Sequence, residues 1–369
     1  MSTQHPPAGD KTFRSLIPFG PQHPVFPEPI QLRLMLEDEK VVEALPMLGY
    51  VHRGLEKIGE QKDFYQNVFL VERVCGICSF IHALAYCQAI ETLMNVTVPD
   101  RAKYLRVAWS ELHRLHSHLL WLGLLADSFG FENLFMRIWR SREIILDLQE
   151  LTGGGRIIVS TNQIGGVKRD IPADLQRRVF EGLDQVERDM EEIIDTVEND
   201  FSVKHRLVGV GRITAEQAHS LGAVGPVLRA CGVESDHRLT GYAAYADLDF
   251  KAVTWQGGDS YARTMVRLYE IPESIRLVRA ALNKLPEGPL NVPVKGNPDG
   301  EVCMRVEQPR GEVVYYIRAN NTKNLERLRI RTPTFANLAP LLHMLPGCQL
   351  ADVGVIVLSI DPCISCTER

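Results

Sequence analysis

The sequence lacks several features that would assign it to a special class of protein. It has no run near the roughly 20 apolar residues that a membrane-spanning helix needs. Its first residues show no basic segment followed by an apolar stretch, so we expect no signal peptide. A net charge of −5 leaves no basic surplus for binding nucleic acid. Eight cysteines among 369 residues are too few for a disulfide scaffold, which favours a reducing compartment and cysteines that bind a metal or react.

What is present is an ordinary globular composition. Hydrophobic residues make up 45% and charged residues 24% of a chain that is long enough to bury a large core without disulfides. We find neither an internal repeat nor a low-complexity segment. Residues 1–16 are predicted to form a flexible tail ahead of a proline-rich turn at 18–24.

Helical periodicity dominates the middle of the chain. It is strongest over residues 101–127, where apolar residues recur at spacings of three and four. Further helices are expected from the first cysteine pair to residue 94 and over 131–150, 173–200 and 260–284. Strands are expected at 30–34, 41–48, 312–319, 328–331 and 352–360, the last a buried strand. The predicted fold class is therefore α+β, predominantly α, with a core of long bundled helices and small β elements near both termini.

Two Cys-x-x-Cys pairs stand at opposite ends of the chain. The first is Cys75 with Cys78, and the second is Cys363 with Cys366, within the last seven residues. Chain ends normally fray, and a free dithiol is reactive, so something must hold this end in place. We infer that the two pairs close on one metal centre.

Four kinds of site could use these cysteines. A structural zinc site is common, but zinc ribbons keep their pairs within roughly 15–20 residues of each other. A thioredoxin-like motif fits the first pair locally and leaves the second unexplained. An iron–sulfur cluster held by four thiolates and a redox-active soft-metal centre are the other two. Arg73, His82 and a Pro-Arg-Gly at 309–311 favour the last, because thiolate sulfurs need cations and N–H donors around them.

The two cysteine motifs together resemble the signatures of nickel–iron hydrogenase large subunits. The matching patterns are Arg73-x-Cys75-Gly76-x-Cys78-x-x-x-His82 and Asp361-Pro362-Cys363-x-x-Cys366-x-x-Arg369. Other segments are similar to the group 4, energy-converting (Ech-type) branch, which is related to respiratory complex I: Gly20-Pro21-Gln22-His23-Pro24, Glu28-Pro29, His52-Arg53-Gly54-x-Glu56-Lys57, Gly153-Gly154-Gly155-Arg156 and Gln308-Pro309-Arg310-Gly311-Glu312. The resemblance implies a single domain over 17–369, with an active site that joins residues 73–82 and 361–369.

The resemblance also implies a role for each cysteine. Cys75 and Cys363 would bind nickel alone, while Cys78 and Cys366 would bridge nickel and an iron that carries two cyanides and one carbon monoxide. The implied reaction is the reversible conversion of H2 into two protons and two electrons. Cys363 would be the first proton acceptor.

Further residues would surround this centre in the family. Glu28 would be the next proton carrier, and Arg310 would overhang the iron and its cyanides. His82 would bond to a bridging sulfur, while Asp361 and Arg73 would lie around the cofactor.

One departure from the family pattern concerns Arg369. Many members have a histidine there, which helps to bind a magnesium or iron ion together with a glutamate at the position of Glu56. An arginine side chain stays protonated and cannot ligate a cation. We therefore expect Glu56 to pair with a basic group such as Arg369, with no magnesium at Glu56.

Two sets of residues are expected to play no part in metal binding. His113, His116 and His118 do not share one face of the 101–127 helix, so we expect them to be packing residues. The four isolated cysteines are expected to be small buried side chains: Cys87, Cys231, Cys303 and Cys348.

The function implied is that of the catalytic large subunit of a membrane-associated, energy-converting hydrogenase. Its partners would be a small subunit with an iron–sulfur cluster, a further iron–sulfur or ferredoxin-interacting subunit, and integral membrane subunits. The chain would lie in the cytoplasm, on the inner face of the membrane. The alternative is a complex I-like quinone-side or coupling subunit that has lost its metal site, against which the presence of all four cysteines argues.

Overall fold

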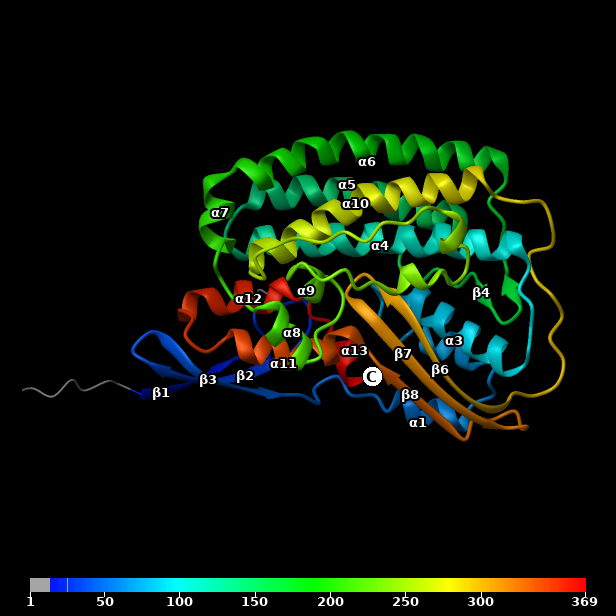
Figure 1. Cartoon of the computed structure of the whole chain (residues 1–369), viewed down its shortest axis with the longest axis horizontal. Helices are drawn as coiled ribbons and strands as arrows, with labels where there is room; N and C mark the ends of the chain where they lie inside the picture. Colours follow the sequence, from blue (N-terminus) through cyan, green and yellow to red (C-terminus); the bar gives the residue numbers. More distant parts are fainter. Residues whose placement is uncertain (1–13, 25) are drawn as a thin grey trace, which may run out of the picture.

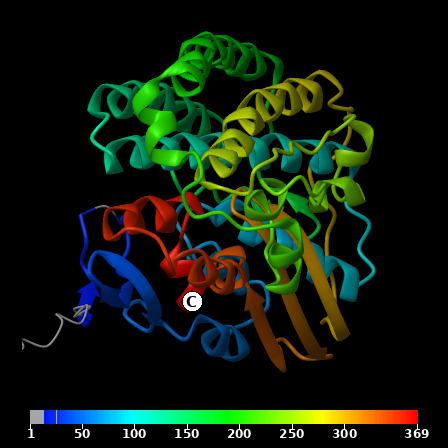
Figure 2. The ribbon, with the colours of Figure 1, turned by 60° about the vertical axis from the view of Figure 1, so that its left-hand side comes forward.

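The computed structural model describes residues 14–24 and 26–369 and confirms the predicted fold class. A layer of long helices lies above a second layer that holds a three-stranded sheet at each end (Figure 1). The C-terminus lies in the second layer, between the two sheets (Figure 2). The chain thus returns its last residues to the middle of the molecule.

Four helices form the upper layer: α4 (Asp100–Ser128), α5 (Glu132–Gly153), α6 (Ala173–Asn199) and α10 (Ser260–Asn283). The central helix α4 packs against both α5 and α10 and is buried around most of its circumference. The outer helix α6 buries one apolar stripe at spacings of three and four and exposes its charged side, as its sequence predicts. Helix α5 ends where Gly154 takes a left-handed φ of 85°, which glycine adopts without strain.

The N-terminal sheet is antiparallel, in the order β1 (Arg14–Phe19), β2 (Gln31–Glu37) and β3 (Lys40–Met47). Strand β1 was not predicted, and it includes the last three residues of the expected tail; residues 1–13 lie outside the described part. The side chains of β1 are mostly exposed, so backbone pairing with β2 holds it and no apolar alternation marks it in the sequence.

The second three-stranded sheet is also antiparallel and consists of β6 (Asp299–Gln308), β7 (Gly311–Asn320) and β8 (Arg327–Arg331). A two-stranded ribbon pairs β4 (Asn162–Gln163) with β5 (Gly166–Val167). The shorter helices are α1 (Leu55–Gln61), α2 (Asn67–Val71), α3 (Ser79–Leu93), α7 (Phe201–Leu207), α8 (Ala215–Ser220), α9 (Pro226–Arg229), α11 (Pro333–Met344), α12 (Val353–Ser359) and α13 (Ile364–Glu368). Three 3-10 turns cover His237–Thr240, Tyr245–Asp247 and Leu350–Asp352.

The strand predicted at 352–360 is wrong, because this segment forms helix α12. Its run of valine, isoleucine and leucine has a high strand propensity, but a short apolar run has no period that separates a strand from a buried helix. The segment packs between α4 and α10, where the surrounding helices cover it on all sides. None of the helices in the described residues combines the length and apolar character that a membrane span requires.

Candidate metal centre

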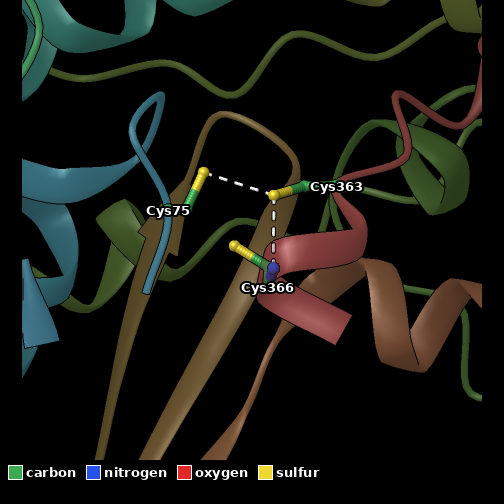
Figure 3. Close-up of side chains that lie close together, drawn as sticks. All are labelled: Cys75, Cys363 and Cys366. Carbon is green, nitrogen blue, oxygen red and sulfur yellow. Dashed lines mark hydrogen bonds between the residues drawn. The ribbon is translucent and has the colours of Figure 1, made fainter. Parts of the chain in front are cut away.

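Four buried cysteines meet where the turn before α3 faces the start of α13. The Sγ atom of Cys75 lies 3.6 Å from that of Cys78 and 3.2 Å from that of Cys363. The sulfur of Cys366 points toward the same place (Figure 3), and the ligand atoms of Cys75, Cys363 and Cys366 all lie within 4.8 Å of one another. Residues almost 300 positions apart thus form one cluster, as the two motifs predict.

Backbone N–H groups organise each pair. Those of Ile77 and Cys78 point at the Cys75 sulfur, at 3.3 and 3.4 Å, and that of Cys366 points at the Cys363 sulfur at 3.3 Å. Hydrogen bonds from the Cys363, Cys366 and Cys78 thiols hold the pKa of Cys75 well below its usual value. Burial raises the pKa of Cys366 well above its usual value.

This donor set fits a soft metal ion. Four closely spaced, buried sulfurs are ligands that soft, thiophilic metals prefer. Without a cation, mutual repulsion and burial keep most of the thiols protonated, and metal binding would release those protons.

Arg310 lies directly against the cluster, as predicted. Its guanidinium donates to the Cys78 sulfur at 3.3 Å and to the Ser117 hydroxyl at 3.4 Å. It also forms an ion pair with Asp361 at 2.8 Å and donates to the Asp361 carbonyl at 2.9 Å. Arg310 therefore fixes the segment that leads into Cys363.

His82 contacts the other side of the cluster. Its Nε2 lies 3.4 Å from the Cys366 sulfur, and its Nδ1 lies 2.7 Å from the Tyr315 hydroxyl. Burial lowers the pKa of His82 to about 4, so the ring is neutral at pH 7. In the tautomer that lets Nε2–H donate to the sulfur, Nδ1 accepts from Tyr315.

Glu28 lies beside the same cluster. Its carboxylate accepts hydrogen bonds from the backbone N–H groups of Ile364 and Ser365, the latter at 3.0 Å, and from the Ser365 hydroxyl. Together with Cys75, Cys363 and Arg310 it lines a cavity of about 270 Å³ with mostly apolar walls.

Arg73 is the one predicted site residue that the structure leaves outside the cluster. Its side chain is 53% exposed and contacts the Phe69 carbonyl at 2.8 Å and the Glu72 carboxylate at 3.2 Å. The turn that aims Cys75 inward directs the side chain of Arg73 outward, and the Arg73 backbone carbonyl accepts from Arg53.

Arg53 is a site residue whose role the sequence did not indicate. It donates to the backbone carbonyls of Arg73 at 2.7 Å, Val74 at 2.8 Å and Ser365 at 3.1 Å. One guanidinium thus joins the two cysteine-bearing segments. The His-Arg-Gly motif marked the position of Arg53 but not its hydrogen-bond partners, which lie as many as 312 residues away.

The C-terminal helix is also held without a metal. The Glu368 carboxylate accepts from the backbone N–H groups of Gly49 and Val51, both at 2.6 Å. The predicted pairing of Glu56 is confirmed, because Arg369 contacts it at 3.0 Å and Arg329 at 2.6 Å. The absence of magnesium there stays a prediction.

The remaining candidates behave mostly as expected. His113, His116 and His118 are buried in the core, and His118 pairs with Glu270 at 2.7 Å. The expectation for the four isolated cysteines is wrong for Cys303, which is exposed on β6. Two others, Cys231 and Cys348, are half-buried, so only Cys87 is fully buried.

Comparison with known proteins identifies the family. The family described as the 49 kDa subunit of respiratory-chain NADH dehydrogenase matches residues 128–297 and 292–369. The family described as nickel-dependent hydrogenase matches residues 53–126, which include the first cysteine pair.

Individual relatives match over nearly the whole chain. A carbon monoxide-induced hydrogenase from Rhodospirillum rubrum is 40% identical over 96% of this chain and 99% of its own length. The alpha subunit of the membrane-bound hydrogenase from Pyrococcus furiosus is 38% identical over 96% of this chain and 87% of its own. A subunit of the F420H2 dehydrogenase from Methanosarcina mazei is 36% identical over 96% of this chain and 97% of its own length. The chain therefore belongs to the oxidoreductase family that unites the large subunits of group 4, membrane-bound hydrogenases with the 49 kDa-type subunits of respiratory complex I.

Proposed function

We propose that this chain is the catalytic large subunit of an energy-converting nickel–iron hydrogenase, which interconverts H2 with two protons and two electrons. The observation that carries the proposal is the convergence of four buried cysteine sulfurs from both ends of the sequence. We treat residues 17–369 as one domain, because each end supplies half of this centre.

The cysteines would hold the metals in the arrangement that the family motifs imply. Cys75 and Cys363 would bind nickel alone, and Cys78 and Cys366 would bind both nickel and iron. When bound, this nickel–iron group, with two cyanides and one carbon monoxide on iron, supplies the heterolytic cleavage of H2. The Arg310 guanidinium is suited to face the anionic ligands, because it is buried beside Cys78 and keeps its charge.

The residues around the cavity are suited to moving a proton away from the centre. Cys363 and Glu28 line the same cavity, so a proton received on the Cys363 sulfur has a carboxylate acceptor nearby. The Ser365 hydroxyl bonds to that carboxylate and can rotate to donate or accept. The apolar walls of Leu120, Trp121, Leu124 and Leu358 suit a small apolar gas.

The proposed partners follow from the chemistry and from the relatives. Electrons must leave the centre, and no second group of cysteines stands in this sequence, so we propose a small subunit with an iron–sulfur cluster and a further subunit that contacts ferredoxin. The Pyrococcus furiosus relative is named as part of a membrane-bound hydrogenase. We therefore propose integral membrane partners and a peripheral position on the cytoplasmic face of the membrane.

Metal analysis together with an activity assay tests this function. The complex purified without oxygen should contain stoichiometric nickel and reduce a viologen dye with H2. The matched variant Cys363→Ser should lose both while remaining folded. A wild-type complex without nickel would refute the proposal and favour a dehydrogenase role like that named for the Methanosarcina mazei relative.

A further inference from the structure

A second group of charged side chains is buried where α4, α9, α10 and β6 meet (Figure 1). We call it the buried ion network. Its side chains are at most 1% exposed, and they are four carboxylates, three guanidiniums and one imidazole: Glu111, Asp236, Glu270, Glu307, Arg114, Arg229, Arg238 and His118.

Arg229 lies at the middle of this network. It contacts Glu270 at 2.6 Å, Glu307 at 2.8 Å and Asp236 at 3.2 Å. Arg238 contacts Asp236 at 2.7 Å, and it also reaches Glu270 at 3.4 Å and Glu111 at 3.3 Å.

The carboxylates are not equally neutralised. Glu111 contacts Arg114 at 3.1 Å in addition to Arg238. Asp236 and Glu270 also have two guanidinium partners each, Arg229 and Arg238. Among the described residues, Glu307 pairs with Arg229 alone. Glu307 is therefore the carboxylate whose negative charge is least compensated.

Within the described chain, the network is also one positive charge short, with four carboxylates against three guanidiniums. An uncompensated buried charge costs several kcal/mol, so a bound proton is favoured. The nearby Arg267 does not supply the missing charge by direct pairing. It donates to the carbonyls of Arg263 and Ser359, both at 3.0 Å, and lies over the ring of Trp121.

Two groups could carry the missing proton. Burial, followed by the charge of Asp236, raises the pKa of Glu307 to about 7. Burial lowers the pKa of His118 to about 4, although its bond to Glu270 opposes that shift. The proton therefore belongs on Glu307 near neutral pH.

The charged and titratable groups around Glu307 act on its pKa in both directions, and burial outweighs the guanidiniums. Arg229 and Arg238 lower its pKa, and Asp236 raises it. Across the β6–β7 ladder stands Glu312, which is itself paired with His237. The Tyr242 hydroxyl accepts from the backbone N–H of Glu307 at 3.2 Å.

Glu307 also contacts a residue that reaches the surface, His237. One carboxylate oxygen accepts from the backbone N–H of His237 at 3.2 Å. The imidazole of that residue is 25% exposed, and the charge of Glu307 acts on it. The carboxylate of Glu307 therefore lies beside the residue that carries a partly exposed, titratable imidazole.

On its other side, the network faces the cysteine cluster. Glu307 precedes Arg310, which contacts Cys78 and Asp361, by only three residues. The buried guanidinium of Arg267 feels the charges of both Asp361 and Glu270. A change of charge at the cluster therefore acts on the network through Asp361 and Arg267 in a medium that screens charge weakly.

We propose that Glu307 is a proton-binding site that takes up one proton from solvent when the cysteine-held centre gains one electron. One O–H bond forms on the Glu307 carboxylate with a proton from solvent, and the electron comes from the iron–sulfur partner. The charge of the interior is thereby unchanged. The electron step rests on the proposed function, whereas the proton site does not.

Infrared difference spectroscopy of the purified complex tests the proposal. In wild type, a protonated-carboxyl band should appear as pH falls between about pH 9 and pH 5 and should also grow on reduction near pH 7. Glu307→Gln should lack this band in both experiments. The control Glu312→Gln removes a neighbouring carboxyl and should keep the band.

Two outcomes would overturn the proposal: the band is missing from folded wild type, or it persists in Glu307→Gln. If Glu307→Gln does not fold, Glu307→Asp should retain the band with a displaced midpoint, and an unmoved midpoint would be a contradiction. The same spectra report carbon monoxide and cyanide on the metal. A sample without those bands but with the Glu307 band refutes the proposed hydrogenase centre and leaves the proton site standing.

Discussion

The cysteine cluster and the buried ion network lie close together in the interior and solve opposite electrostatic problems. The cluster brings four sulfurs together with Arg310 as the one guanidinium that touches them among the described residues, so it requires a metal cation to be fully ionised. The network carries its own guanidiniums and is only one positive charge short of balancing its carboxylates. In the proposals above, the site that the chain leaves unneutralised would bind a metal, and the one that it nearly neutralises would bind a proton.

Of the substitutions that test this difference between the two regions, one at a proposed metal ligand should have the largest effect on activity. Cys75→Ser should abolish nickel binding and H2 turnover, because a hydroxyl is a poor ligand for a soft metal. The far-ultraviolet circular dichroism should stay as in wild type, since Arg53 and Glu368 hold the cysteine-bearing segments without metal. The half-buried Cys231→Ser is the control and should retain nickel. Full nickel occupancy in Cys75→Ser would show that the cluster is not the metal site.

The proton acceptor at the cavity should give the next largest effect. Glu28→Gln should lower H2-dependent turnover by about 10²–10⁴-fold, the usual contribution of a general acid or base. Nickel content should not change, because Glu28 contacts no sulfur through a hydrogen bond in the described structure. Glu37→Gln, which alters a half-buried glutamate paired with the exposed Arg14, is the control. Wild-type turnover in a metal-replete Glu28→Gln sample would exclude the relay.

Removing the centre of the ion network should affect folding more than metal binding. Arg229→Ala removes the guanidinium that pairs with Glu307 and leaves Asp236 and Glu270 with Arg238 alone among the described guanidiniums. Breaking a buried ion pair in this way should lower the free energy of unfolding by about 3–5 kcal/mol. Denaturant titration measures this loss, and Arg177→Ala, which breaks an exposed pair with Glu181, should cost less than about 1 kcal/mol. Equal losses for the two variants would mean that the network does not stabilise the fold.

The pH dependence of stability should single out Glu307. Its pKa is raised to about 7 in the folded protein, so the folded state binds more protons than the unfolded state above pH 4.5. The free energy of unfolding should therefore fall as pH rises from about 4.5 to about 7, by up to about 3 kcal/mol from this one group. Denaturant titrations at several pH values should show a flatter profile in Glu307→Gln. An unchanged profile would mean that Glu307 is ionised throughout.

The smallest effect is expected at the edge of the cluster, where Arg369 pairs with Glu56. The pair is partly exposed and Arg329 also contacts Glu56, so Arg369→Ala should cost only about 1 kcal/mol in the free energy of unfolding. Metal analysis of wild type should find no stoichiometric magnesium. Magnesium that is lost in Glu56→Gln would contradict the view that a guanidinium replaces the cation.

The two regions also differ in how far the sequence predicts them. The cluster was predictable because Cys-x-x-Cys spacing is local, and the motifs also marked His82, Arg310 and Asp361, which the structure brings to the sulfurs. Arg73 belongs to the same motif, but its side chain points away from the sulfurs, because a motif fixes the position of a residue and not the direction of its side chain.

The ion network was not predictable in the same way. Its members come from α4, α9, α10, β6 and the 3-10 turn His237–Thr240 with the residue before it, and partners such as Glu111 and Arg238 are 127 residues apart, so no spacing marks them. The long helices were predicted because periodicity accumulates over many turns. Helix α12 was missed because a short, mostly apolar segment of seven residues carries no such period.

The most direct test of the central claim is infrared spectroscopy of the complex purified without oxygen, combined with nickel analysis of the same sample. The account predicts stretching bands from one carbon monoxide and two cyanides on iron, stoichiometric nickel, and loss of both in Cys363→Ser. Folded wild-type protein from cells able to build such centres that shows neither these bands nor nickel would contradict it.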